Sequence, residues 1–307
     1  MQVFLHPSDQ PVFRLAVRSS QCMVELRVND VPVFCEVTGT ALSLDLPLNE
    51  WLFQGMNVIQ VLLSPLEEGS AFGSEAAIEA TLQHKFARDS VRNVSDIGVL
   101  QWKAEPELPH GHLGFEEPAG PDSDPLLEDA DEDAPLLALP GQAEELNWRI
   151  GSPKKLRNKS VRISSILLLP PPWPACPWAR SQSLPDDQRT LFAVQGLVRA
   201  YHQRLQFGGY EDLVKLRRQA LEAAYYIHGE DADEALGFPA LLKRGEWVLQ
   251  PLPEQGLRLE LAGQGRLARL LDESTAESPL VLVNESEGVA AVLDAWWMFN
   301  GEWLLVR

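Results

Sequence analysis

The sequence predicts a two-domain protein, in which an all-β sandwich is followed by an α+β domain with a curved antiparallel sheet. Three observations favour this fold class. The chain has 307 residues, more than one hydrophobic core usually organises. Short segments that alternate apolar and polar residues recur through residues 12–84, as they do in sandwiches. From residue 184 onward, helical periodicity comes first and strand patterns follow, which is an α+β order.

The strands expected in the N-terminal part share a period of two, which indicates one buried and one exposed face. They are Val12–Arg18, Met23–Val28, Val31–Val37, Leu42–Leu48, Asn57–Leu63 and Ala76–His84. Asn29 and Asp30 tolerate the positive φ of a tight turn, so they predict a hairpin between the second and third strands. Asn49 is expected to cap a short helical turn that ends at Gly55.

Two stretches of this region, VELRVNDVPVF and LPLNEWLFQGMNVIQVLL, resemble the jelly-roll accessory domains found in many glycoside hydrolases. The resemblance implies a jelly-roll-like sandwich that serves as a binding or scaffolding module. It leaves a carbohydrate-binding accessory protein as one alternative function, because sandwiches carry many unrelated functions.

The centre of the chain holds two adjacent blocks of opposite charge. Residues 104–146 contain thirteen Asp and Glu but no Lys or Arg, and they carry most of the net charge of −18. The following block, residues 147–183, contains seven Lys and Arg but no acid. Within it, Ser160–Leu169 is predicted to be a strand that returns to the first sandwich. The predicted first domain therefore comprises 1–103 plus 147–175, and 104–146 is an acidic, Pro-rich insertion or linker.

The predicted second domain, residues 184–307, begins with three helices. The first starts near Ser183 or Asp186 and places five residues on one apolar face: Leu191, Val194, Val198, Tyr201 and Leu205. The second places Leu213, Leu216, Ala220, Ala224 and Ile227 on one face, and the third covers Glu234–Leu242. Six strands are expected to follow: Glu246–Gln250, Leu257–Leu261, Arg266–Leu271, Leu280–Val283, Val289–Phe299 and Glu302–Arg307.

This order and length resemble the nuclear-transport-factor-2-like superfamily. The resemblance implies a cone-shaped fold, which occurs in pocket enzymes and in binding domains. Asn300 and Gly301 predict a two-residue turn that pairs Phe299 with Glu302. In that register Asp294 lies opposite Arg307, and the two are expected to form an ion pair. Both faces of this last hairpin are apolar, so both are expected to be covered.

The search for reactive motifs favours a protein that is not an enzyme. The histidines follow no metal-ligand spacing, no Gly-rich phosphate loop follows a strand, and no G-x-S-x-G elbow is present. We therefore expect no metal, no cofactor and no catalytic residue. Three cysteines argue against a disulfide framework, so buried free thiols are expected. The alternative is a small-ligand-binding protein or enzyme of the nuclear-transport-factor-2-like kind, with proton-transfer groups in one pocket: Tyr201, His202, Tyr225, His228 and Asp294.

In overall character the chain resembles bacterial immunity proteins of the type VI secretion kind. That resemblance implies a cytoplasmic, non-enzymatic inhibitor that binds a basic toxin, such as a nuclease. No run of about 18 apolar residues and no signal-peptide pattern is seen, so neither a membrane contact nor export is expected. Direct nucleic-acid binding is not expected either, and a homo-oligomer is left open. The acids predicted to contact the partner are Asp129, Asp131, Glu132, Asp133, Glu230, Asp231, Asp233 and Glu234.

Overall fold

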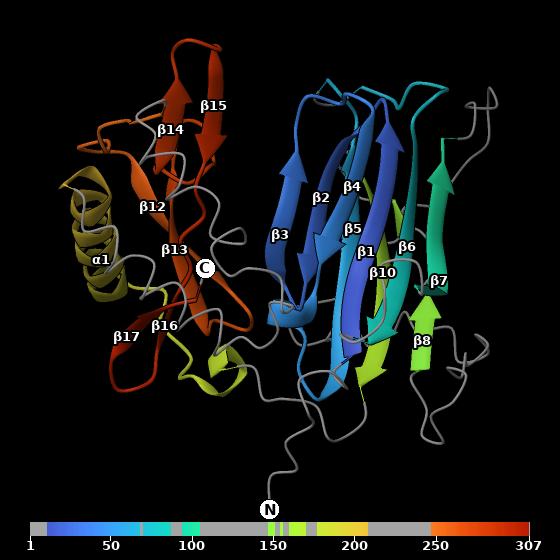
Figure 1. Cartoon of the computed structure of the whole chain (residues 1–307), viewed down its shortest axis with the longest axis horizontal. Coiled ribbons are helices and arrows are strands. Elements are labelled where there is room, and N and C mark those ends of the chain that lie inside the picture. Colours follow the sequence, from blue (N-terminus) through green and yellow to red (C-terminus); the bar gives the residue numbers. More distant parts are fainter. Residues whose placement is uncertain are drawn as a thin grey trace, which may run out of the picture. The chain divides into compact units, whose positions relative to one another are not determined.

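The computed structural model describes residues 11–67, 70–86, 94–104, 147–150, 154–155, 160–169, 177–207 and 247–306. The chain divides into two compact units, unit 1 (Met1–Pro174) and unit 2 (Ala175–Arg307). Figure 1 shows the elements of both units. Of the helices in the described ranges, none has the length and apolarity that crossing a membrane requires.

The predicted fold class, a jelly-roll-like sandwich followed by a nuclear-transport-factor-2-like α+β domain, is wrong. The described part of the chain is mostly β, with a single α-helix and four small antiparallel sheets. Only the first of the three predicted helices falls within it, while the second and third lie outside the described residues. The strands that follow the helix form two separate small sheets instead of one curved sheet.

Unit 1 is built from two antiparallel sheets. Sheet 1 has the order β4 (Leu42–Pro47), β1 (Pro11–Ser20), β6 (Ala77–Phe86) and β7 (Ser95–Lys103). Sheet 2 has the order β3 (Val31–Glu36), β2 (Met23–Val28), β5 (Gly55–Ser64), β10 (Val161–Leu169) and β8 (Asn147–Ile150), and β9 (Lys154–Lys155) also pairs with β10. The returning strand expected at Ser160–Leu169 is β10, which pairs with β5 along its whole length.

The alternation in the sequence explains the core of unit 1. Leu15 and Val17 of β1 are buried and lie in register with Leu82 and Ala80 of β6. β2 and β5 bury the matching side of sheet 2 through Leu26, Val28, Ile59, Val61 and Leu63. β7 contacts β8, so the two sheets meet along one edge. Each sheet thus buries the apolar side chains of one of its faces.

The predicted hairpin turn is confirmed, because Asn29 and Asp30 have positive φ and Val28 pairs with Val31. The predicted capping role of Asn49 is wrong. Asn49 lies within the short 3-10 turn η2 (Asn49–Trp51), whose N-cap residue is Leu48 and makes no side-chain capping hydrogen bond. Its side-chain amide instead accepts a hydrogen bond from Phe13 N at 2.8 Å and donates one to Pro11 O at 2.8 Å. The amide thus pairs with the backbone of β1 as a strand would.

A second buried amide, Asn57, ties this end of unit 1 together. Its Oδ1 accepts hydrogen bonds from Phe53 N and Asn29 Nδ2, both at 2.9 Å. Its Nδ2 donates to Phe53 O at 2.8 Å and to Gly55 O at 3.0 Å. Asn29 in turn donates to Trp51 O at 2.7 Å. The network joins the β2–β3 turn, η2 and the start of β5, so two spaced Asn residues hold an irregular segment in one conformation.

Unit 2 contains a 3-10 turn, one described helix and two sheets. The helical elements are η3 (Pro177–Arg180) and α1 (Gln188–Phe207). Sheet 3 has the order β11 (Val248–Leu249), β14 (Val281–Asn284) and β15 (Val289–Val292). Sheet 4 has the order β12 (Leu257–Ala262), β13 (Leu267–Asp272), β16 (Trp297–Phe299) and β17 (Trp303–Leu305).

The helix α1 is capped by Asp187, whose Oδ1 accepts a hydrogen bond from Thr190 N at 2.8 Å. The predicted start at Ser183 or Asp186 is therefore slightly early. The predicted apolar face is confirmed: Val194, Val198, Tyr201 and Leu205 are buried, and Leu191 packs partly buried beside them. This face packs on residues of sheet 4 that include Ala268, Leu270, Trp297 and Leu305.

The predicted register of the last hairpin is wrong by one residue. Phe299 pairs with Trp303 and not with Glu302, because the loop has three residues and Gly301 adopts a φ of 82°. The predicted strand Val289–Phe299 is also divided, into β15 of sheet 3 and β16 of sheet 4. Both faces of the last hairpin were expected to be covered: Trp297 and Met298 of β16 are buried, whereas Phe299, Trp303 and Leu304 are only half-buried.

Candidate protein-binding surface

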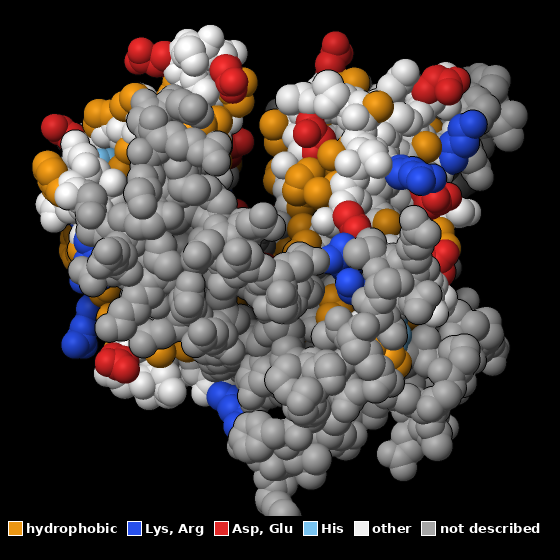
Figure 2. Space-filling model, viewed as in Figure 1, with side chains coloured by type: hydrophobic (Ala, Val, Ile, Leu, Met, Phe, Trp, Pro, Cys, Tyr) orange, Lys and Arg blue, Asp and Glu red, His pale blue; other side chains and the backbone are white. Residues whose placement is uncertain are grey.

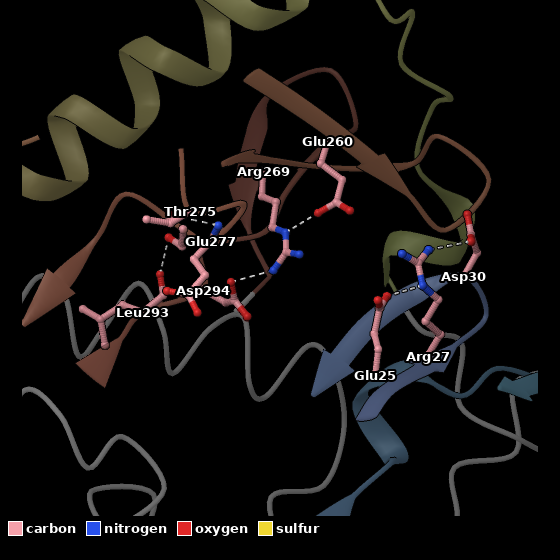
Figure 3. Close-up of polar contacts among 10 residues, drawn as sticks. Glu25, Arg27, Asp30, Glu260, Arg269, Thr275, Glu277, Leu293 and Asp294 are labelled. Carbon is pink, nitrogen blue, oxygen red and sulfur yellow. Dashed lines mark hydrogen bonds and ion pairs between the residues drawn. The ribbon is translucent and has the colours of Figure 1, made fainter. Parts of the chain in front are cut away.

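The least exposed ion pairs of the described residues surround Arg269 on β13 (Figure 3). Its Nε lies 2.5 Å from Glu260 Oε2 on the neighbouring strand β12, and its Nη1 lies 2.7 Å from Asp294 Oδ1. The guanidinium also stacks on Trp296, with 4.5 Å between its carbon and the ring centroid. Asp294 was predicted to pair with Arg307, which lies outside the described residues, whereas the structure pairs it with Arg269.

Unit 1 holds a similar cluster on the β2–β3 hairpin, also drawn in Figure 3. Arg27 contacts Glu25 at 2.5 Å and Asp30 at 3.2 Å. In both clusters one guanidinium is shared by two carboxylates, so each cluster carries a net charge of −1. Because the donors of each arginine are directed to carboxylates of the same unit, we interpret both clusters as structural ion pairs.

The residues of the predicted pocket take part in different contacts. Tyr201 lies in the core between α1 and sheet 4, with its ring edge-on to Trp297 at 6.2 Å. His202 is next to it on α1, and its Nε2 lies 2.8 Å from Gln250 O. Asp294 pairs with Arg269, the strand neighbour of the core residue Ala268. Since consecutive strand residues point to opposite faces, Tyr201 and Asp294 contact opposite faces of sheet 4. Tyr225 and His228 lie outside the described residues.

The eight acids predicted to contact a partner, which fall within 129–133 and 230–234, also lie outside the described residues. Within the described ranges, no three His, Cys, Asp or Glu side chains gather closely enough to hold a metal ion. Cys22 is a buried free thiol, as expected, and burial raises the pKa of its thiol, whereas Cys35 is exposed and not buried as expected.

Sheet 3 presents an unusual exposed surface, which we call the valine face. The pairings Val248 with Val283, Val281 with Val292 and Val283 with Ala290 place five residues on one side of the sheet: Val248, Val281, Val283, Ala290 and Val292. Val248 is 49% exposed and Val292 is 43% exposed, and none of the five is buried. The opposite side carries the buried Leu282 and Leu249, which packs against the core of unit 2. A sheet that covers a core on one side usually has polar residues on the other, so the five apolar residues there form a candidate contact surface.

Acidic residues lie in the loops before and after β14, the central strand of sheet 3. Residues 247–306 contain nine Asp and Glu against three Arg and no Lys. Glu285 and Glu287 lie in the exposed loop between β14 and β15, and Glu273 and Glu277 lie in the exposed loop before β14. Figure 2 shows acidic and hydrophobic side chains side by side over β14 and β15. The surface therefore combines apolar area with negative charge, a combination that fits a basic protein.

Two loops around this surface are shaped by side-chain caps. Asn284 is buried, and its Oδ1 accepts hydrogen bonds from Ser286 N at 3.1 Å and Glu287 N at 3.3 Å, which orders the acidic β14–β15 loop. At the other end, the side chain and then the backbone N–H of Ser274 lower the pKa of Asp272 by hydrogen bonding. Asp272 therefore carries its charge at neutral pH and below.

Comparison with known proteins adds no relative: no family model, no curated protein and no solved structure matches the chain.

The sequence pattern alone did not point to the valine face. The patterns that could have indicated this face are the spacing of two between Val281 and Val283 and the apolar run Val289–Val292. Because Val289–Phe299 was predicted as one strand, its first four residues were assigned to the hairpin of β16 and β17, and the sheet they belong to was missed.

Proposed function

We propose that this chain is a non-enzymatic inhibitor, an immunity protein that neutralises a basic bacterial toxin by binding it directly in the cytoplasm. The observation that carries the proposal is the valine face with acids in the loops before and after β14. An exposed apolar patch supplies the area that a protein complex buries, and the acids select a partner of opposite charge. The net charge of −18 would also speed the encounter with a basic protein at low salt.

The two ion-paired clusters do not offset the acidity of the chain, because each keeps a net charge of −1. Arg27 and Arg269 each form ion pairs with two acidic residues of their own unit. A nuclease is a suitable target, because its phosphate-binding surface is basic and negative side chains can occupy that surface in place of the nucleic acid. Toxins of the type VI secretion kind are the class we propose.

The proposal is tested with the chain and the protein encoded by the neighbouring gene, both purified. We expect a complex whose dissociation constant rises steeply between 50 and 300 mM salt, on the order of tenfold or more for several charge pairs. We also expect the toxic activity of the neighbouring protein to be suppressed at equimolar inhibitor. No complex at low salt, or a complex that leaves the activity intact, would contradict the proposal.

Charge-neutral variants locate the surface. In Glu285→Gln/Glu287→Gln, two acids beside the valine face lose their charge. The free energy of binding should weaken by roughly 0.4–2 kcal/mol, and the dissociation constant should depend less steeply on salt. The matched control is Glu254→Gln/Glu302→Gln, which removes two exposed acids elsewhere in unit 2. A third variant neutralises Asp129, Asp131, Glu132 and Asp133 together. If only the third variant weakens the complex, the acidic tract is the contact and the valine face is not.

A further inference from the structure

The strand β15 forms one edge of sheet 3. It pairs with β14 on one side, and on its other side none of the described strands pairs with it. Val289, Ala290 and Val292 are all exposed. Two edge strands of unit 1 carry residues that discourage pairing with a further strand: Pro32 in β3, and Asp45 and Pro47 in β4. β15, with the sequence VAAV, contains neither a charge nor a proline.

The hydrogen-bond register shows which backbone groups face the open edge. Leu293 N donates to Leu280 O at 2.8 Å, so these two residues form a hydrogen-bonded pair. Hydrogen-bonded and non-bonded pairs alternate in antiparallel sheets, which makes the pairs of Ala290 with Val283 and of Val292 with Val281 non-bonded. The N–H and C=O groups of Ala290 and Val292 therefore point away from β14, toward the open edge.

The side chains of these same two residues belong to the valine face. A strand that adds to β15 would pair its backbone with Ala290 and Val292 and extend the valine face with its own apolar side chains. At the end of β15 it would pass the loop that holds Glu285 and Glu287. Lysine or arginine in the added strand would therefore meet these carboxylates.

We infer that the open edge of β15 is a strand-addition site for an extended, basic and apolar segment of the partner protein. The charge of that partner rests on the proposed function. A second copy of this chain fits less well, because it would bring its own Glu285 and Glu287 to the same edge and add a second net charge of −18. The edge itself, with its four outward backbone groups and its valine face, is a property of the described residues.

The test uses the full chain and two synthetic peptides that differ only in charge, acetyl-(Lys-Val)4-amide and acetyl-(Glu-Val)4-amide. Amide hydrogen exchange is measured residue by residue by NMR. With saturating basic peptide, we expect exchange at Ala290 and Val292 to slow at least about fivefold, because their N–H groups become hydrogen-bonded. The acidic peptide should leave both rates unchanged. Equal slowing by the two peptides, or no slowing by either, overturns the inference.

Two variants make the assignment specific. Ala290→Pro removes one outward N–H and keeps the bonds between β15 and β14, so binding of the basic peptide should be lost. Glu285→Gln/Glu287→Gln changes no backbone donor, so the edge should still bind the basic peptide, at least about threefold more weakly at low salt. This second variant remains informative even if the proline variant does not fold. If exchange at Ala290 slows with the concentration of the chain alone, the occupant is a second copy and the inference is overturned.

The same variants separate this inference from the proposed function. If the basic peptide protects the edge but the neighbouring-gene protein does not bind, the proposed function fails and the strand-addition site stands. If that protein binds wild type and a folded Ala290→Pro variant with equal affinity, the strand-addition site fails and the proposed function stands.

Discussion

Replacing Arg269 with Met tests whether the cluster around it is structural. Methionine keeps most of the apolar length of the arginine and removes the guanidinium. The change eliminates two ion-paired hydrogen bonds, at 2.5 Å to Glu260 and 2.7 Å to Asp294, and the stacking on Trp296. A hydrogen bond to a charged group contributes about 1.5–3 kcal/mol and a cation–π contact about 0.5–2 kcal/mol. Because the carboxylates are partly exposed, we expect a loss of about 3 kcal/mol in the free energy of unfolding.

The two ion pairs of Arg269 should differ in strength, because the side chain of Glu260 is 19% exposed and that of Asp294 is 38% exposed. Double-mutant cycles with Glu260→Gln and Asp294→Asn, measured by urea unfolding, should give coupling energies of about 1.5 and about 0.5 kcal/mol. The weaker coupling should also fall more when salt is added. A reversed order, or an Arg269→Met variant with the urea midpoint of the wild type, would show that the cluster does not stabilise unit 2 in this way.

Three further predictions concern stability. Asn57→Ala removes the five hydrogen bonds that the buried amide makes and should lower the free energy of unfolding by about 3 kcal/mol, whereas unchanged stability would show that the network contributes nothing. Asp187→Ala removes the cap of α1 and should lower the melting temperature. The pKa of Asp187 is lowered by the backbone N–H and then the side chain of Thr190, so its contribution is present above the ordinary aspartate pKa of about 4 and is lost as the pH falls through the lowered pKa. The melting temperatures of wild type and Asp187→Ala, measured from pH 7 to pH 2, should converge at the acid end, and a constant difference would refute the cap assignment. Gly263→Ala should lower the free energy of unfolding by at least about 1–2 kcal/mol, because Gly263 has a φ of 60° and an added Cβ would lie 2.8 Å from Trp178 Cζ3. Thermal or urea unfolding measures this loss. The control is Gly196→Ala on α1, where an added Cβ meets nothing within 4 Å.

Local patterns predicted the individual elements well. The alternation in β1 and β6, the turn at Asn29 and Asp30, and the apolar face of α1 each depend on residues close together in the chain, and all appear as expected. The failures concern how elements combine. One strand was predicted where the chain leaves sheet 3 and enters sheet 4, because the run Val289–Phe299 is apolar except for Asp294 and contains neither Gly nor Pro.

The candidate surface could not be predicted from the sequence because exposure is a tertiary property. Val248 lies far in the chain from Val283 and Ala290, and the three share a face only through the pairing of β11, β14 and β15. Their side chains are as apolar as those of a core strand, so their composition predicts burial. The partner of Asp294 could not be predicted either. The hairpin register predicted Arg307, whereas the packing of β13 against the segment before β16 pairs Asp294 with Arg269.

The sequence by itself determined the acidity of the chain, the periodicity of its strands and the position of its main described helix, since these follow from composition and from neighbours in the chain. Only the tertiary structure decided which strands share a sheet, which arginine the acids of unit 2 surround, and which apolar strand keeps an open edge. The physical reason is that strand pairing depends on hydrogen bonds between distant segments, and one residue of register exchanges the buried and exposed faces.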